Sequence, residues 1–171
     1  MVLPALVALA ALVGSEKAPP TDAAVALQRL RSLQGEWKGT VVWTGARTDT
    51  GEMGVSYRLT GNGSAVVEDL LSDGRPTMTT VYHLDGNDLR MTHYCGAGNQ
   101  PRLKAKQIDL ARNAIAFEFV DATNLAGPDA PHVHGFRIHL VDPDHLELEF
   151  DFLAQGKLAV EHITVARVRP S

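Results

Sequence analysis

Alternation of apolar and polar residues dominates most of this chain. Between residues 146 and 152 four apolar side chains alternate with three acidic ones, Leu146, Leu148, Phe150 and Phe152 against Glu147, Glu149 and Asp151. A period of two residues is typical of a β-strand with one buried and one solvated face. Turn signals such as Gly61-Asn62-Gly63 and Asp142-Pro143-Asp144 separate comparable segments. The pattern predicts ten strands, near residues 36–44, 52–60, 64–71, 77–84, 88–95, 102–109, 113–120, 134–142, 145–153 and 157–168.

One amphipathic helix is expected ahead of the strands. Thr21-Asp22 can cap a helix that runs from about Ala23 to Leu33 and ends at Gly35. Its apolar face is made of four residues, Val25, Leu27, Leu30 and Leu33. This is the only segment of the chain with a convincing helical period.

Ten consecutive strands joined by short turns predict an all-β fold. An open sheet of this size exposes its edges, so closure into an up-and-down antiparallel β-barrel is the economical arrangement. A two-sheet sandwich is the alternative, but Greek-key sandwiches need longer crossing connections. The one long connection, Asp121 to Pro131, is long enough to lie over one mouth of a barrel.

The N-terminal segment predicts export. Val2 to Val13 is almost wholly apolar and is followed by Gly14-Ser15, a pattern of a cleaved signal peptide, although no basic residue precedes it. The run is too short to span a bilayer as a helix, so no membrane-spanning segment is expected in the mature chain. We therefore expect a signal peptide at 1–15, a linker at 16–22 and one barrel domain at 23–171. The protein is then periplasmic or secreted.

Composition narrows the choice of partner. The chain has 171 residues, which suits one domain, and a net charge of -4 with acids and bases interspersed. Such a surface carries no basic footprint for nucleic acid. The only cysteine, Cys95, cannot form an internal disulfide. Oligomeric state is left open by the sequence.

A short motif at the start of the first strand carries a family resemblance. Gly35-Glu36-Trp37-Lys38-Gly39 resembles the Gly-x-Trp opening of lipocalin-like, or calycin-like, barrels. Its form is most similar to nitrobindin-like and fatty-acid-binding-protein-like barrels and to uncharacterised exported bacterial proteins around them. The resemblance implies that Trp37 packs at the closed end of the barrel, under an arginine of the last strand. Arg167 and Arg169 are the candidates, through stacking on the indole.

The alternation also predicts which side chains face the interior. The inward set consists of ten residues, Trp37, Val41, Trp43, Met53, Val55, Tyr57, Leu59, Ile115, Phe117 and Phe119. A barrel of eight to ten strands is near the size that holds one small molecule. A mostly apolar cavity with a few polar groups is therefore the expected site.

The segment around Cys95 is the strongest candidate for the polar part of that site. Leu89, Met91, His93 and Cys95 share one face, and their apolar company predicts that His93 and Cys95 point inward. The alternative is a buried histidine that is only hydrogen-bonded to a neighbour. The predicted ligand-binding set is Trp43, Tyr57, His93, Tyr94, Cys95, Asn99 and Arg102. The leading hypothesis is an exported barrel that binds a small, largely apolar ligand, with no cofactor.

Haem binding is the first alternative. The nitrobindin-like resemblance implies a haem held by an interior histidine of the last strand, and His162 is the residue at that position. The two faces of this strand are equally apolar, so the inward face is ambiguous. Covalent attachment is excluded because the chain has no Cys-x-x-Cys-His motif.

An enzyme and a metal site are weaker alternatives. His93-x-Cys95 places a thiol and an imidazole on one strand face, but no third catalytic member is visible, and we favour a protein without catalytic activity. His132-x-His134, with His139 nearby, offers two imidazoles on one face. Two ligands do not make a site, so no metal is expected.

Overall fold

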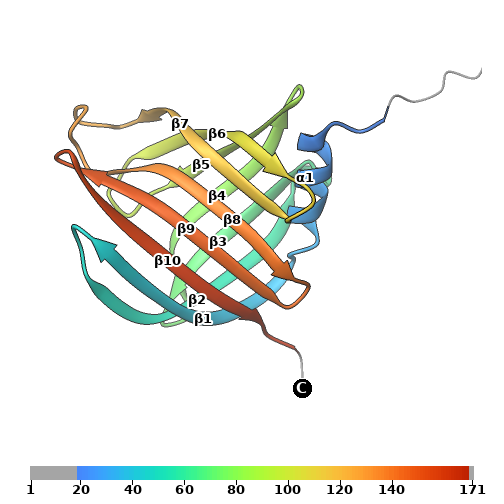
Figure 1. Ribbon diagram of the computed structural model, residues 1–171, viewed down its shortest axis with the longest axis horizontal. Helices are drawn as coiled ribbons and strands as arrows, with labels where there is room; N and C mark the ends of the chain where they lie inside the picture. Colours follow the sequence, from blue (N-terminus) through green and yellow to red (C-terminus); the bar gives the residue numbers. More distant parts are fainter. Residues whose placement is uncertain (1–18, 170–171) are drawn as a thin grey trace, which may run out of the picture.

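The protein forms a closed barrel of ten antiparallel strands with up-and-down connections (Figure 1). The computed structural model describes residues 19–169, and the predicted signal peptide lies outside them. The strands are β1 (Gly35–Gly45), β2 (Asp49–Thr60), β3 (Ala65–Ser72), β4 (Arg75–Asp85), β5 (Asp88–Tyr94), β6 (Gln100–Asp109), β7 (Ala114–Thr123), β8 (His132–Asp142), β9 (His145–Ala154) and β10 (Lys157–Arg167). The predicted barrel is thus confirmed over the sandwich.

Closure comes from the pairing of the first strand with the last. β1 is hydrogen-bonded to β2 on one side and to β10 on the other, with Trp37 opposite Arg167. Each of the strands β2 to β9 pairs with its two neighbours in sequence. A single 3₁₀ turn, η1 (Gly61–Gly63), links β2 to β3. The described chain therefore presents no free sheet edge in this barrel.

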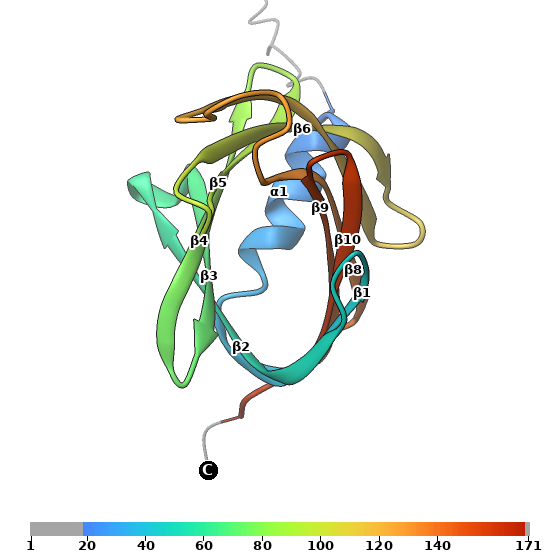
Figure 2. The same cartoon turned by 90° about the vertical axis from the view of Figure 1, so that its left-hand side faces the viewer.

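One helix, α1 (Asp22–Arg31), covers one end of the barrel, and Figure 2 shows it across the far end of the interior. The Thr21 hydroxyl accepts a hydrogen bond from the Ala24 amide, as expected of an N-cap. The Arg29 guanidinium ties the helix to the β6–β7 turn through the Leu110 carbonyl and the Asn113 amide oxygen. We call this end of the barrel the closed end.

The helix differs from its predicted form in two respects. It ends at Arg31, before Leu33, with Ser32 as its C-cap. Val25, predicted on the buried face, is only half-buried, because Ala23 and Ala26 take the positions against the barrel. Small side chains there let the helix backbone lie close to the core.

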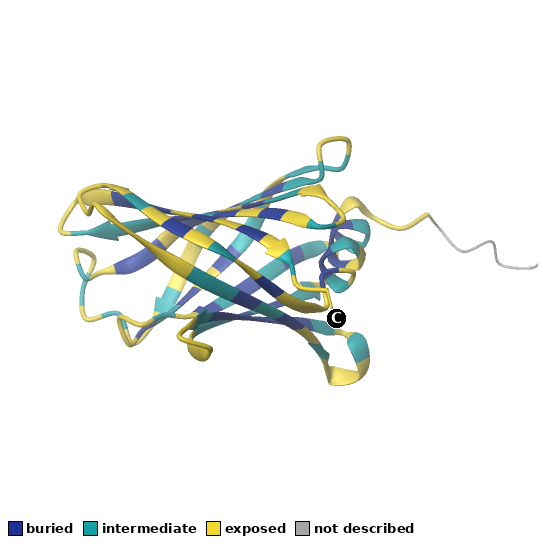
Figure 3. Ribbon diagram, turned by 90° about the horizontal axis from the view of Figure 1, so that it is seen from below, coloured by how far each residue is buried: buried dark blue, intermediate teal, exposed yellow. Residues whose placement is uncertain are grey.

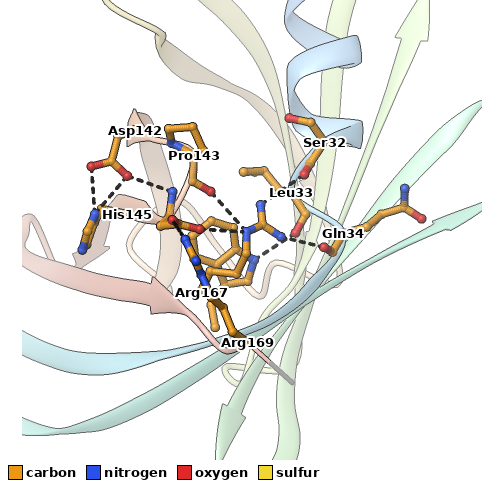
Figure 4. A network of polar contacts seen from close by, with 10 residues as sticks. Ser32, Leu33, Gln34, Asp142, Pro143, His145, Arg167 and Arg169 are labelled. Carbon is orange, nitrogen blue, oxygen red and sulfur yellow. Dashed lines mark hydrogen bonds and ion pairs between the residues drawn. The ribbon is translucent and has the colours of Figure 1, made fainter. Parts of the chain in front are cut away.

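The closed end is fastened by the tryptophan and arginine that the family resemblance implied. Trp37 is buried and its Nε1 donates to the Leu33 carbonyl, 2.9 Å away. The Arg167 guanidinium lies 4.2 Å from the centre of the indole ring. It also donates to three backbone carbonyls, those of Ser32, Gln34 and Pro143 (Figure 4). Arg167 and Arg169 both pair with the Asp144 carboxylate.

Burial follows the predicted alternation along the strands (Figure 3). All ten residues of the predicted inward set are buried or half-buried. Because neighbouring strands run in opposite directions and α1 leads into β1, the turns after odd-numbered strands gather at the end opposite α1. We call this the open end.

The long connection lies at the open end, shortened to residues 124–131 because β7 extends into it as far as Thr123. It is hydrogen-bonded to the turns on either side. The Gln155 amide donates to the Asp129 carbonyl, and the Asn99 side chain donates to the Pro131 carbonyl. The connection thus spans from the β9–β10 turn to the β5–β6 turn.

Candidate functional site

A cavity of about 510 Å³ opens at the end of the barrel opposite α1. Most of its wall is aromatic or aliphatic, with Trp43, Met78, Val133, Phe150, Phe152 and Ala159. The rings of Trp43 and Phe152 pack edge to face, with their centroids 6.1 Å apart. His93, Cys95 and Glu161 supply polar atoms. Arg47 and Gln155 lie in turns at the entrance, and Lys157 is the first residue of β10. We call this space the open-end cavity.

His93 projects into the cavity wall from β5 and is only 1% exposed. Its ring packs against Phe150, with centroids 5.3 Å apart, and its Nδ1 lies 2.9 Å from the Thr80 hydroxyl oxygen. Its Nε2 is buried without a hydrogen-bond partner among the described residues. Burial lowers the pKa of His93 to about 4, so the imidazole is neutral at physiological pH.

Glu161 is a second buried polar group on the wall, and the sequence analysis missed it. It lies on β10 between Trp43 of β1 and Phe150 of β9, and is 4% exposed. Within residues 19–169, its carboxyl group has no hydrogen-bond or ion-pair partner. Burial raises its pKa to about 7, against the opposing attraction of the Arg47 guanidinium. The carboxyl group can therefore be neutral or charged near physiological pH.

Cys95 lines the cavity as a half-buried thiol. Burial raises its pKa, although the Ala97 amide donates to the sulfur across 3.5 Å. The nearby Glu161 carboxyl group raises it further. A thiol held in its protonated form is a poor nucleophile. Cys95 is therefore suited to packing against a ligand and not to the thiolate–imidazolium pair considered from sequence.

The other predicted ligand-binding residues lie at different depths. Trp43 lines the cavity with His93 and Cys95, whereas Tyr57 is buried deeper, where its hydroxyl donates to Glu68. Asn99 is buried beneath the long connection and bonds Pro131. Only three of the seven ligand-binding residues predicted from the sequence, Trp43, His93 and Cys95, therefore line the cavity.

Tyr94 and Arg102 lie on the outside of the barrel. Tyr94 is 51% exposed, because it follows His93 and so has the opposite strand phase. Arg102 pairs with Asp121 of β7 through two hydrogen bonds of 2.5 and 2.7 Å. A β-bulge between Arg102 and Leu103 shifts the register there. Neither side chain belongs to the cavity wall.

His162, the residue of the haem alternative, also lies on the outer face. Its Nδ1 pairs with the Glu149 carboxylate at 2.8 Å, and its side chain is 45% exposed. The residues of β10 that face the interior are those of the opposite alternation, Ala159, Glu161, Ile163 and Val165. The apolar members of that set were the signal by which Glu161 could have been found.

The remaining histidines are paired with protein groups. His132 and His134 contact each other at 3.2 Å and both rings pack on Phe119. His139 pairs with Glu147. Within residues 19–169 no three metal-ligating side chains come together in a metal-binding arrangement. No helix in that part of the chain has the length and apolarity required to cross a membrane.

Beneath the cavity lies a second buried carboxyl group, which the sequence analysis also missed. Glu68 of β3 is fully buried, and the hydroxyls of Tyr57 and Tyr82 donate to its Oε2 at 2.6 and 2.8 Å. Burial raises its pKa to about 7 in spite of these donors. Its Oε1 has no hydrogen-bond partner of good geometry. This cluster places polar atoms within an otherwise apolar core.

Comparisons with known proteins give a fold and no family. No family model matches the chain, and no curated protein matches it. A protein of unknown function from the DUF3598 family of Nostoc punctiforme has a similar structure, with a TM-score of 0.55 and 16% identity. That match covers 80% of this chain but 48% of the other, so the present chain spans about half of that protein. Rv2717c from M. tuberculosis matches with a TM-score of 0.54 and 18% identity, over 84% of this chain and 98% of its own. At these identities the likeness shows a shared fold.

Proposed function

We propose that this protein binds a small, largely apolar molecule in the open-end cavity. The observation that carries the proposal is the cavity itself, about 510 Å³ in volume and walled mainly by aromatic and aliphatic side chains. Its size falls within the range of about 300–1,000 Å³ typical of small-molecule sites. Two buried polar groups, His93 and Glu161, add the few directed contacts that fix a ligand's orientation.

The build of the barrel supports this function. Helix α1 and the Trp37–Arg167 contact occupy the closed end, so entry is left to the opposite end. Arg47 stacks on Trp43 at 4.2 Å, beside the entrance. The predicted signal peptide supports one further part of the proposal, that binding takes place after export.

Neither alternative function gains support from the geometry. His162 lies outside the barrel in an ion pair, and Cys95 has a raised pKa. Binding without chemistry is the function that the wall residues fit best.

A cavity-filling substitution tests the proposal. Ala159 lines the cavity from β10, so Ala159→Phe places a ring in the space that a ligand needs. Ala166 is exposed on the same strand, which makes Ala166→Phe a matched control. We expect the uncharged fluorescent probe N-phenyl-1-naphthylamine to bind the wild type and Ala166→Phe, and to bind Ala159→Phe at least about tenfold more weakly.

The measurement is a fluorescence titration, together with circular dichroism to establish that all three proteins are folded. If the wild type does not take up the probe, or Ala159→Phe binds it as tightly as the wild type, the cavity is not the binding site. Native mass spectrometry of the freshly purified protein would then identify any molecule that copurifies.

A further inference from the structure

A row of four polar side chains crosses the inner wall of the barrel and ends at the open-end cavity. Tyr57, Glu68, Thr80 and His93 lie on the successive strands β2 to β5 and are direct partners in the strand register. All four are buried. Cross-strand partners on one face have close side chains, so each member can hydrogen-bond the next. We call this set the polar row.

The atoms left unsatisfied lie on either side of Thr80. Glu68 Oε1 and His93 Nε2 are both buried without a partner of good geometry in the described part of the chain. Thr80 contacts His93 Nδ1 through its hydroxyl oxygen at 2.9 Å. The same hydroxyl interacts with the Glu68 carboxylate, where it favours the charged form together with the two tyrosines.

A threonine hydroxyl has one hydrogen to donate. When Glu68 is ionised, its carboxylate can only accept, so the Thr80 hydrogen is directed to it. The Thr80 oxygen must then accept from His93 Nδ1–H. A neutral imidazole carries one hydrogen, so Nε2 is left as a buried acceptor without a protein partner, in a ring that lines the cavity.

We propose that Glu68, acting through Thr80, positions the proton of His93 so that Nε2 accepts a hydrogen bond from a hydroxyl or N–H group of the ligand. This inference rests on the proposed function, because it requires a ligand in the open-end cavity. The ligand class is an apolar molecule with an uncharged hydrogen-bond donor, such as a phenol or an alcohol. His93 is the specificity-determining contact and Glu68 is a positioning residue.

The charges around the polar row favour the same ligand class. Asp69 is the charged neighbour that acts on Glu68, and Tyr57, Tyr82 and Thr80 are its polar neighbours. Glu161 shares the cavity with His93, and Arg47 and Lys157 lie at its entrance. A ligand carboxylate placed beside an ionised Glu161 would meet like charge, whereas a hydroxyl group would not.

Glu68→Gln is expected to reverse the direction of hydrogen-bond donation along the polar row. With the tyrosine hydroxyls donating to the amide oxygen, the amide nitrogen donates to Thr80. Thr80 then donates to His93 Nδ1, and Nε2 carries the imidazole hydrogen. Glu52 is exposed on the outside of β2, so Glu52→Gln is the matched control.

The first experiment needs no ligand. Long-range ¹H–¹⁵N NMR of the imidazole identifies which nitrogen carries the hydrogen, and His93 is assigned by its loss in His93→Gln. At about pH 8, above the pKa of Glu68, we expect protonated Nδ1 in the wild type and in Glu52→Gln. We expect protonated Nε2 in Glu68→Gln. A wild type with protonated Nε2, or no change in Glu68→Gln, overturns the proposal.

The second experiment compares two probes with the same ring system, 2-naphthol and its methyl ether 2-methoxynaphthalene, by fluorescence titration at the same pH. We expect the wild type and Glu52→Gln to bind 2-naphthol about fivefold more tightly than the ether. The preference disappears or reverses in Glu68→Gln. If Glu68→Gln does not fold, Thr80→Val breaks the polar row and should bind both probes equally.

The two experiments test the proposed function and the role of Glu68 separately. Binding of neither probe overturns the proposed function and the ligand class with it, while the NMR result judges the arrangement of protons alone. An equal preference for 2-naphthol in wild type and Glu68→Gln overturns the role of Glu68 even where the cavity binds both probes.

Discussion

Glu68, Glu161 and His93 are ionisable side chains inside the barrel whose pKa values are displaced by burial. The pKa values of Glu68 and Glu161 are raised from 4.5 to about 7, and the pKa of His93 is lowered from 6.5 to about 4. In each case the barrel favours the uncharged form. Natural cores hold few such groups without a specific use, so their position at and beneath the cavity connects stability to binding.

The pH dependence of stability should change in Glu161→Gln. The folded-state pKa of Glu161 lies above its unfolded value, so its contribution is fully present below about pH 4.5 and is lost as pH rises through about 7. A displacement of this size corresponds to about 3 kcal/mol. We therefore expect the stability of Glu161→Gln relative to the wild type to increase by about that much between pH 4.5 and 8. The measurement is the free energy of unfolding from urea denaturation across this range.

The control for this prediction is Glu52→Gln, which removes an exposed carboxyl group and should follow the wild type at every pH. Parallel stability curves for Glu161→Gln and the wild type would show that the carboxyl group is as well solvated in the folded state as in the unfolded state.

Tyr57→Phe should destabilise the protein through Glu68. The Tyr57 hydroxyl donates to the buried carboxyl group at 2.6 Å, and without it one donor to Oε2, Tyr82, remains. We expect a loss of about 1–3 kcal/mol, measured by chemical denaturation at about pH 8, where Glu68 is ionised. The loss should shrink below the pKa of Glu68, because a neutral carboxyl group needs fewer donors.

Tyr94→Phe provides the comparison, since Tyr94 is exposed on the outer face and its substitution should cost less than about 0.5 kcal/mol. Equal effects of the two substitutions would mean that the hydroxyl of Tyr57 contributes nothing beyond packing.

Single residues show where prediction from sequence succeeds and fails. His93 and Cys95 were placed inward because apolar neighbours two residues away share their phase. Glu161 was missed because the two faces of the last strand are equally apolar in sequence, and Glu68 because each face of residues 66–71 holds one acidic residue among apolar ones. Their partners come from other strands, and only the barrel register brings Thr80 and the tyrosines to Glu68.

Among the elements, Arg167 joins the end of β10 to the segment between α1 and β1. Arg167 leaves the last strand, stacks on Trp37 and donates to the backbone that joins α1 to β1. It also donates to the Pro143 carbonyl of the β8–β9 turn. Three segments far apart in sequence are thereby joined at the closed end (Figure 4).

Arg167→Lys should weaken the closed end although the charge is kept. An ammonium group cannot stack as a plane on Trp37 or reach three carbonyls with a rigid fork of donors. We expect a loss of about 1–3 kcal/mol in thermal or urea unfolding, with a changed near-ultraviolet dichroism signal from the tryptophan.

Arg169→Lys is the matched control. Arg169 is two residues further on and pairs with Asp144 at an exposed position, so this change should cost at most about 0.5 kcal/mol. If the two substitutions have the same effect, the Arg167 contacts add no more than a surface ion pair.

Strand number and order were predictable because ten alternating segments are separated by turn residues. Strand ends were less so, and β2 begins at Asp49, not at residue 52. The bulges in β6 and β8 were not predictable either. A bulge depends on how two strands pair, so the alternation of one strand does not reveal it.

For the whole molecule, the division into a closed and an open end decides where function can lie. The helix, Trp37 and Arg167 fill one end, and the polar row lies in the interior between that end and the cavity. Space for a ligand remains at the end formed by the turns after odd-numbered strands. Length and alternation predicted a barrel, whereas the location of the space required the positions of α1 and the turns.

Closure itself depends on the contact between β1 and β10, and Gly39 is the position at which it can be tested. A Cβ at Gly39 would lie 1.9 Å from the Thr164 carbonyl oxygen and 2.8 Å from the Val165 Cα, both backbone atoms of β10. Backbone in a paired strand cannot move aside as the end of a flexible side chain can, so Gly39→Ala must separate the two strands. We expect a loss of about 3 kcal/mol or more, with faster amide hydrogen exchange in β1 and β10 than in β4 and β5.

Gly51→Ala is the control, because a Cβ there meets only the Val41 side chain, at 3.7 Å. The stability of this variant should stay within about 1 kcal/mol of the wild type. Equal stability of the two variants would show that β1 and β10 are not held this closely, and that the barrel tolerates an opening between its first and last strands.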